Sequence, residues 1–209
     1  PEPPPDNGQH IALGCFTAYL AFLDRIGEGA SVRREPLELP VLDENGRRAA
    51  IRPSAAALLG YLHLPLGDRL RILKALARWG STATDGTFAD ALRQRGQSAR
   101  AIERFWDVFI RPALNLPAEK AAAEAGDFTV RTALLSGRRA SDLLLPTRPL
   151  GVMHGEAAGR VLEAAGANVH TGARVDDLGR LDADAVVVAL PPAESARLAD
   201  EFAEAVGRG

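Results

Sequence analysis

The 209-residue chain has one cysteine, Cys15, and aromatic side chains make up only 5% of it. A single cysteine cannot form an internal disulfide, so the chain is compatible with a reducing compartment such as the cytoplasm. No stretch reaches the ~18 apolar residues that a membrane-spanning helix needs. The Pro-rich start at residues 1–5 has neither the charged nor the apolar region of a secretory signal peptide.

Several chemical signatures are also missing. The four histidines, at positions 10, 63, 154 and 170, have no i, i+4 spacing and belong to no HExxH or Cys/His cluster, so no metal site is predicted. The formal net charge is -2, which offers nothing to recruit nucleic acid or an anionic membrane by bulk charge. There is no GxSxG nucleophile elbow, no P-loop and no GxGxxG turn to hold a pyrophosphate.

What is present is a soluble globular composition, with 46% hydrophobic and 25% charged residues. Most of the chain has apolar residues at helical spacing. One hairpin is predicted where the turn signal Asn45-Gly46 separates strands at residues 36–42 and 48–51. The helices predicted around it span residues 13–26, 66–79, 87–95, 98–114 and 117–135, with another opening at Pro53 and Ser54.

The pattern changes near Pro149. Helices are predicted at residues 152–165 and 194–206, and strands at residues 168–170, 173–175 and 185–190. The last strand is apolar without alternation, which is typical of a strand buried on both faces of a parallel sheet. The predicted fold class is therefore α+β or α/β. A loop at residues 1–12 and a mainly helical domain at 13–148 precede part of a Rossmann-like α/β layer at 149–209.

Two constellations could bear function. In the run Asp6-Asn7-Gly8-Gln9-His10, the polar residues can simply cap a helix. Alternatively, Gly8 lets the backbone approach a planar ligand, with Gln9 and His10 supplying hydrogen bonds. The aromatic residues Phe105, Trp106 and Phe109 share one side of a predicted helix, where they form either core or pocket.

Four stretches, in order, resemble the squalene-associated FAD-dependent desaturases, also described as hydroxysqualene dehydroxylases, of the phytoene desaturase and amine oxidase superfamily. The first is the run at residues 6–10 followed by a helix. The others are the Phe105-Trp106-Asp107 motif with its following Ala-Leu-Asn-Leu-Pro, the Gly137 to Pro146 segment, and the Ala183 to Pro192 strand motif. The last is shared by many flavoproteins, so the first three carry most of the resemblance.

The resemblance implies FAD as redox carrier and an apolar isoprenoid such as a hydroxylated squalene as substrate. It makes residues 1–12 a flavin-proximal loop at the reactive edge of the flavin, with His10 as the catalytic candidate. It makes residues 13–148 the substrate-binding domain and residues 149–209 part of the FAD-binding domain. It also implies a set of cofactor-binding and substrate-binding residues. The cofactor-binding residues would be Asp6, Asn7, Gly8, Gln9, Val175 and Pro191. The substrate-binding residues would be Phe105, Trp106 and Phe109.

The chain departs from the family pattern by lacking the GxGxxG unit and the Gly-Asp segment near the pyrophosphate. We therefore expect an internal piece of a longer enzyme that does not itself retain FAD. Alternatives are another superfamily member (a carotenoid desaturase, amine oxidase or porphyrinogen oxidase) or a non-catalytic lipid-binding domain. An apolar substrate would also be compatible with peripheral contact to a membrane.

Overall fold

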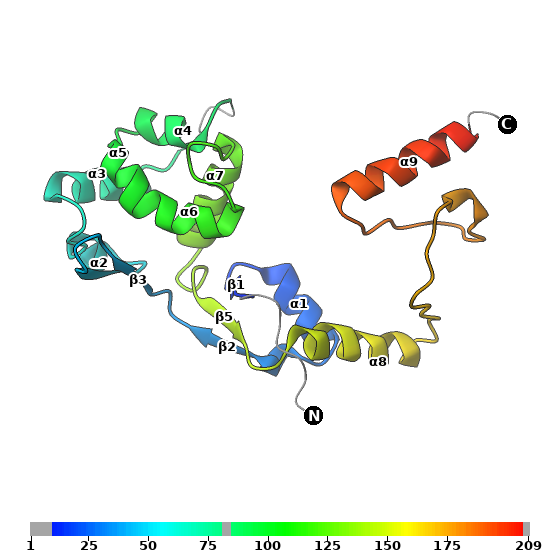
Figure 1. Ribbon diagram of the computed structural model, residues 1–209. Helices are drawn as coiled ribbons and strands as arrows, with labels where there is room; N and C mark the ends of the chain where they lie inside the picture. Colours follow the sequence, from blue (N-terminus) through cyan, green and yellow to red (C-terminus); the bar gives the residue numbers. More distant parts are fainter. Residues whose placement is uncertain (1–9, 81–84, 207–209) are drawn as a thin grey trace. The chain divides into compact units, whose positions relative to one another are not determined.

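A computed structural model describes residues 10–80 and 85–206 (Figure 1). The fold is α+β, as predicted, with helices and two small antiparallel sheets. The chain divides into two compact units, residues 1–161 and 162–209. Within the described residues, no helix is both long enough and apolar enough to cross a membrane.

The first unit contains a three-stranded sheet that the sequence did not predict. Strands β1 (Ala12–Leu13) and β2 (Val32–Glu35) both pair antiparallel with β5 (Leu143–Pro146), which lies between them. The sequence predicted a helix that starts at residue 13. This helix begins later in the structure, as α1 (Thr17–Arg25). The intervening Gly14 is needed because a Cβ at this position would overlap the Arg139 carbonyl oxygen.

The predicted hairpin is confirmed. Strands β3 (Leu39–Leu42) and β4 (Arg48–Ile51) pair antiparallel, and Gly46 adopts a φ of 74° in the connecting turn. The Asp43 carboxylate stabilises this turn by accepting hydrogen bonds from the backbone N–H groups of Asn45 (2.9 Å) and Arg47 (2.8 Å).

A helical layer follows the hairpin. It consists of α2 (Ala55–Leu59), α3 (Leu66–Ala77), α4 (Phe88–Gln94), α5 (Ala99–Ala101), π-helical turn η2 (Ile102–Trp106), α6 (Asp107–Leu114), α7 (Ala123–Val130) and π-helical turn η3 (Arg131–Leu135). Side chains cap three of these helices at their predicted starts: Ser54 for α2, Thr87 for α4 and Ser98 for α5.

Helix α7 begins six residues after Pro117, where the sequence predicted its first turn. The segment between them has another role. The carbonyl oxygens of Ala121 and Ala118 accept hydrogen bonds from the backbone N–H groups of Phe88 (2.8 Å) and Ala89 (2.9 Å). These donors belong to the first turn of α4, so the segment satisfies groups that have no partner within their own helix.

The main core lies among the helices of this layer and extends to the hairpin through Leu37 and Ile51. Its largest fully buried side chains include Trp106, Tyr61, Phe88, Ile72 and Leu92. A smaller cluster joins Leu23 and Ile26, at the end of α1, to Met153 and Ala157. The latter two residues belong to π-helical turn η4 (Gly151–Glu156) and helix α8 (Ala157–Ala164). This cluster holds the start of α8 on α1, and the first unit extends to residue 161.

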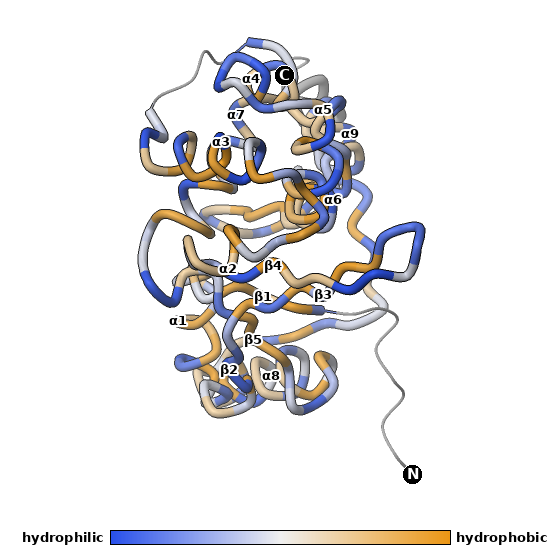
Figure 2. Tube along the Cα trace, turned by 90° about the vertical axis from the view of Figure 1, so that its left-hand side faces the viewer, coloured by the Kyte–Doolittle hydropathy of each residue, from blue (hydrophilic) through white to orange (hydrophobic). Residues whose placement is uncertain are grey.

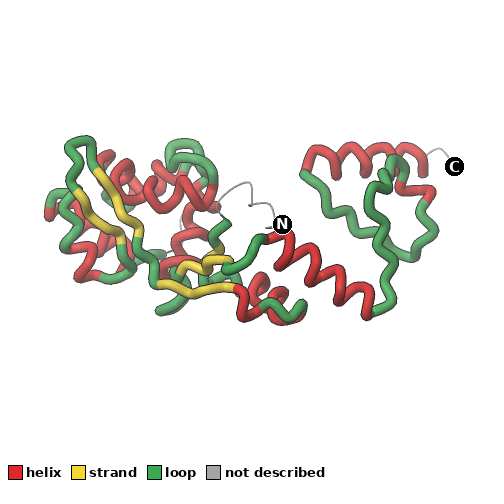
Figure 3. Tube along the Cα trace, turned by 60° about the horizontal axis from the view of Figure 1, so that its bottom comes forward, coloured by secondary structure: helices red, strands yellow, loops and turns green. Residues whose placement is uncertain are grey.

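The second unit contains a short 3₁₀ turn, η5 (Leu178–Arg180), and helix α9 (Pro192–Val206). The strands predicted at residues 168–170, 173–175 and 185–190 are wrong, because all three segments are loop in this structure (Figure 3). The run at 185–190 is exposed rather than buried, with Val187 91% accessible. A strand forms only when a neighbour completes its ladder of hydrogen bonds, and the described part of this unit supplies no such neighbour.

Candidate functional site

An apolar cavity of about 270 Å³ lies in the first unit between the hairpin, α2, α3 and the turns η2 and η3. Most of its walls are aliphatic or aromatic, which suits a hydrocarbon ligand rather than a polar one. The lining residues are Leu37, Ile51, Arg52, Pro53, Ser54, Ala55, Leu58, Leu73, Leu76, Ala77, Phe105, Phe109, Leu134 and Leu135.

The polar side chains at this cavity already have partners. The Arg52 guanidinium donates to the Glu38 carboxylate through Nε (2.9 Å) and Nη2 (2.5 Å), and this pairing lowers the pKa of Glu38. The Ser54 hydroxyl accepts a hydrogen bond from the Ala57 backbone N–H (3.1 Å). Neither group needs a ligand to satisfy it, so the cavity presents an essentially apolar interior.

The three predicted aromatic residues have different positions in the structure. Phe105 and Phe109 line the cavity and are each less than 10% exposed. Trp106 is not part of the cavity wall and is fully buried in the core. Its indole Nε1–H donates to the Gln97 side-chain oxygen (3.1 Å), which fixes its orientation.

His10 lies in a second, more open pocket of about 410 Å³. In this pocket, Leu145 and Pro146 at the end of the Gly137 to Pro146 motif lie near His10, the last residue of the 6–10 motif. The other lining residues are Ile11, Leu145, Pro146, Thr147, Arg148 and Pro149. The pairing of β1 with β5 creates this proximity. No local signal identified Arg148, whose guanidinium donates to the buried Glu28 carboxylate (2.9 and 3.0 Å).

The remaining predicted site residues fall elsewhere. Asp6, Asn7, Gly8 and Gln9 lie outside the described residues and stay predictions. In the second unit, Val175 lines a pocket of about 650 Å³ whose walls include the exposed run Val186, Val187, Val188, Ala189 and Leu190. Pro191 follows that run, and its carbonyl oxygen accepts a hydrogen bond from the Ser195 backbone N–H (3.0 Å) in α9.

No family model matches this chain. No curated protein matches its sequence at a significant level either. Within the described parts of the chain, no group of three histidine, cysteine or acidic side chains could hold a metal ion.

The start of helix α9 can be compared with a flavin pyrophosphate site. Such a site needs free backbone N–H groups at a helix N-terminus, next to a glycine-rich turn. Helix α9 follows the exposed apolar run and begins at Pro192, directly after Pro191, so its first turn offers fewer backbone N–H groups than usual and no glycine precedes it directly. The cavity of the first unit can enclose apolar chains.

Proposed function

We propose that this chain supplies the substrate-binding part of an FAD-dependent oxidoreductase that acts on an isoprenoid lipid, such as a hydroxylated squalene. The observation that carries the proposal is the apolar cavity, whose polar neighbours Arg52 and Ser54 are already paired. A polyene offers few groups to hydrogen-bond, so its recognition depends on shape and apolar area.

The proposal also rests on the order of the sequence motifs. Three of them occur in the first unit: the 6–10 run, the Phe105-Trp106-Asp107 motif and the Gly137 to Pro146 segment. The Rossmann-like layer and the FAD itself remain part of the proposal. In the enzyme we envisage, the flavin would supply the redox chemistry. This chain would orient the lipid and exclude water from it.

The cavity is small for such a substrate. Its volume of about 270 Å³ lies just below the roughly 300–1,000 Å³ of most ligand pockets. We infer that it takes one end of the isoprenoid.

A second candidate function is lipid binding without catalysis. The same apolar cavity favours it, because nothing about the cavity requires a flavin. The two proposals agree on the ligand and differ on the redox step, so the first experiment tests the ligand that both share.

The experiment measures how much squalene the purified chain retains after equilibration and gel filtration. Ala77, the last residue of α3, lines the cavity and is exposed, so Ala77→Phe fills the space without burying a new group in the core. We expect retention to fall about tenfold or more, equivalent to ~1.4 kcal/mol of binding free energy.

Ala164→Phe is the matched control, since Ala164 is the exposed last residue of α8 and lies outside the cavity. It should bind squalene as the unmodified chain does. Equal retention by Ala77→Phe and the control, or no retention by any variant, would remove the support that the cavity gives to both functions.

A further inference from the structure

Four leucines are exposed between the end of α2 and the second turn of α3. Leu59 is 40%, Leu62 75%, Leu66 56% and Leu70 51% accessible. Leu66 and Leu70 are one turn apart on α3, so they share one side of the helix. Figure 2 shows hydrophobic and hydrophilic residues mixed within the turns of α3. This many large apolar side chains in twelve residues is more than the scattered exposure usual on a soluble surface.

The most exposed of these leucines is held outward by fixed neighbours. Leu62 lies between Tyr61 and Leu64, which are each only 1% exposed. The Tyr61 hydroxyl donates to the Arg104 carbonyl oxygen (2.6 Å). The Arg69 guanidinium donates through Nε to the Leu64 carbonyl oxygen (2.8 Å) and through Nη1 to the Leu59 carbonyl oxygen. The exposure of Leu62 is therefore a property of a well-anchored loop.

Positive charge gathers next to the same segment. Leu62 and Pro65 border a polar pocket of about 410 Å³, and Asp43 is the one carboxylate in its lining. The arginines that line it are Arg47, Arg69, Arg100 and Arg104. This excess of cations contrasts with the net charge of -2 for the whole chain.

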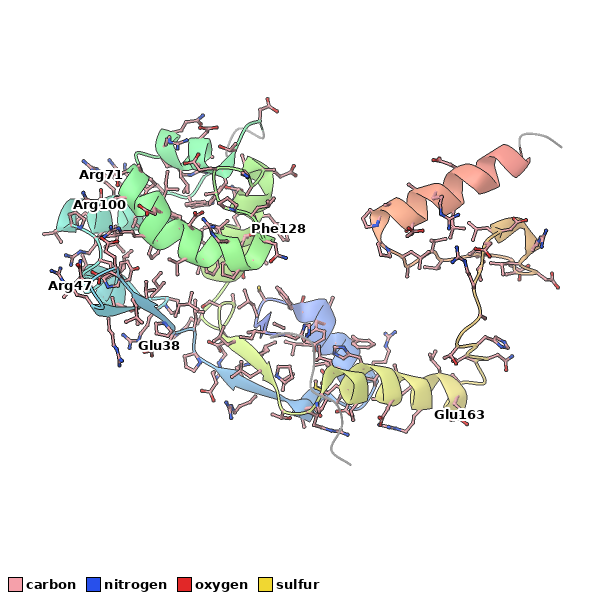
Figure 4. All side chains as sticks on the ribbon, viewed as in Figure 1. Glu38, Arg47, Arg71, Arg100, Phe128 and Glu163 are labelled. Carbon is pink, nitrogen blue, oxygen red and sulfur yellow. The ribbon has the colours of Figure 1, made fainter. Side chains whose placement is uncertain are left out.

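Three of these arginines form no ion pair with another described residue. Within the described parts of the chain, the guanidinium groups of Arg47, Arg69 and Arg100 have no carboxylate within ion-pair distance, whereas Arg104 pairs with Glu44 (3.2 Å). The hydrogen bond from the Arg47 backbone N–H lowers the pKa of Asp43, and the charge of Arg47 adds to this effect. Figure 4 shows Arg47 and Arg100 at one edge of the helical layer and Phe128 at its opposite edge. Unpaired cations beside exposed leucines match a surface that is both anionic and apolar.

We propose that this leucine–arginine face, made of the four leucines 59, 62, 66 and 70 and the four arginines 47, 69, 100 and 104, docks on a membrane that contains anionic phospholipids. The leucines enter the boundary between headgroups and acyl chains, and the guanidinium groups contact lipid phosphates. The inference goes beyond the proposed function, because docking requires neither flavin nor turnover.

Docking would also bring lipid close to the apolar cavity. The stripe that carries Leu66 and Leu70 continues along α3 to Leu73 and Ala77, and these last two residues line the cavity. A ligand that leaves the bilayer along this stripe would remain in contact with apolar side chains.

The test is flotation of the chain with vesicles of phosphatidylcholine alone and of phosphatidylcholine with phosphatidylglycerol. We expect binding to the anionic vesicles that weakens as salt is raised. Arg47→Gln with Arg100→Gln should weaken it about thirtyfold, since each basic residue near an anionic surface contributes about fivefold. Leu62→Ser with Leu66→Ser should weaken it about tenfold or more.

Phe128→Ser and Arg138→Gln are the matched controls, because both residues are exposed and neither belongs to the leucine–arginine face. They should bind vesicles normally. No binding to anionic vesicles, or equal loss in the controls, would overturn the proposal. Binding of inorganic phosphate without vesicle binding would identify a site for a soluble anion instead. Failure of docking with squalene retention intact would leave the proposed function standing.

Discussion

At the scale of single residues, the helical core closes around Trp106. Its ring centroid lies 5.2 Å from that of Phe105, 5.4 Å from Trp79 and 6.4 Å from Phe88. The indole N–H also donates a hydrogen bond to the side-chain oxygen of Gln97, a buried residue that is 5% exposed. This residue therefore combines a large apolar surface with a buried hydrogen bond, and its two contributions can be separated by mutation.

Trp106→Ala should lower the free energy of unfolding by ~3–5 kcal/mol, because it leaves a large cavity. Trp106→Phe keeps most of the packing but leaves Gln97 without its donor, at a cost of about 1–3 kcal/mol. Urea unfolding of both variants measures these losses. Phe128→Ala, at a side chain that is 66% exposed, should change stability by less than ~0.5 kcal/mol. A Trp106→Ala protein as stable as the parent would exclude a core role.

Glu28 is a buried carboxylate held by several cationic or hydroxyl donors. The Ser31 hydroxyl donates to it, and Arg148 and Arg160 lie within ion-pair distance at 2.9 and 3.8 Å. The hydrogen bond from Ser31 is the largest cause of a lowered pKa, and the two arginines add to it. These contacts favour the ionised form in the folded protein.

A lowered pKa makes Glu28 a source of pH-dependent stability. Its contribution is complete above the unfolded-state pKa of about 4.3 and is lost as pH falls through the lower pKa of the folded state. Thermal melts between pH 7 and pH 3 should therefore show a smaller acid-side loss for Glu28→Gln than for the parent. Glu163→Gln, at an exposed position, is the control (Figure 4). Parallel curves for parent and Glu28→Gln would contradict the assignment.

At the scale of elements, the sequence predicted the helix starts and the turn that depend on interactions between neighbouring residues. The caps at Ser54, Thr87 and Ser98 and the Asn45-Gly46 turn depend on a few neighbouring residues, and all four are found where the sequence placed them. Strands β1 and β5 could not be found this way, because their partners lie about 130 residues apart. The same long-range pairing brings Arg148 beside His10, so that part of the candidate site was also invisible in the sequence.

Two helical glycines should respond oppositely to the same substitution. In α7, a Cβ on Gly126 would overlap the Phe88 ring, whereas a Cβ on Gly159 in α8 would meet nothing within 4 Å. Gly126→Ala should destabilise the protein by ~1–3 kcal/mol through overpacking. Gly159→Ala should stabilise it by about 0.5–1 kcal/mol, because alanine loses less backbone entropy in a helix. Urea midpoints of the two variants give the comparison, and shifts of the same sign would refute it.

At the scale of the whole molecule, the two units differ in how much of their predicted structure is formed. The first unit buries an extensive core, whereas the second exposes the apolar run at 185–190. The composition of that run predicted a strand buried on both faces. Composition describes what a segment would prefer in a completed sheet, and it cannot show whether the neighbouring strands are present.

The chain alone should not bind FAD with one site per molecule. Without a glycine-rich turn at a helix N-terminus, the two pyrophosphate charges would lose water without gaining partners, at a cost of several kcal/mol. A deficit of ~5 kcal/mol weakens affinity more than a thousandfold. Isothermal titration with FAD measures this directly, and sub-micromolar binding would contradict it.

Joining a βαβ unit with a GxGxxG turn to the N-terminus should give a yellow protein. If that unit also pairs with residues 185–190, their amide hydrogens should exchange more slowly than in the chain alone, because a formed ladder protects them.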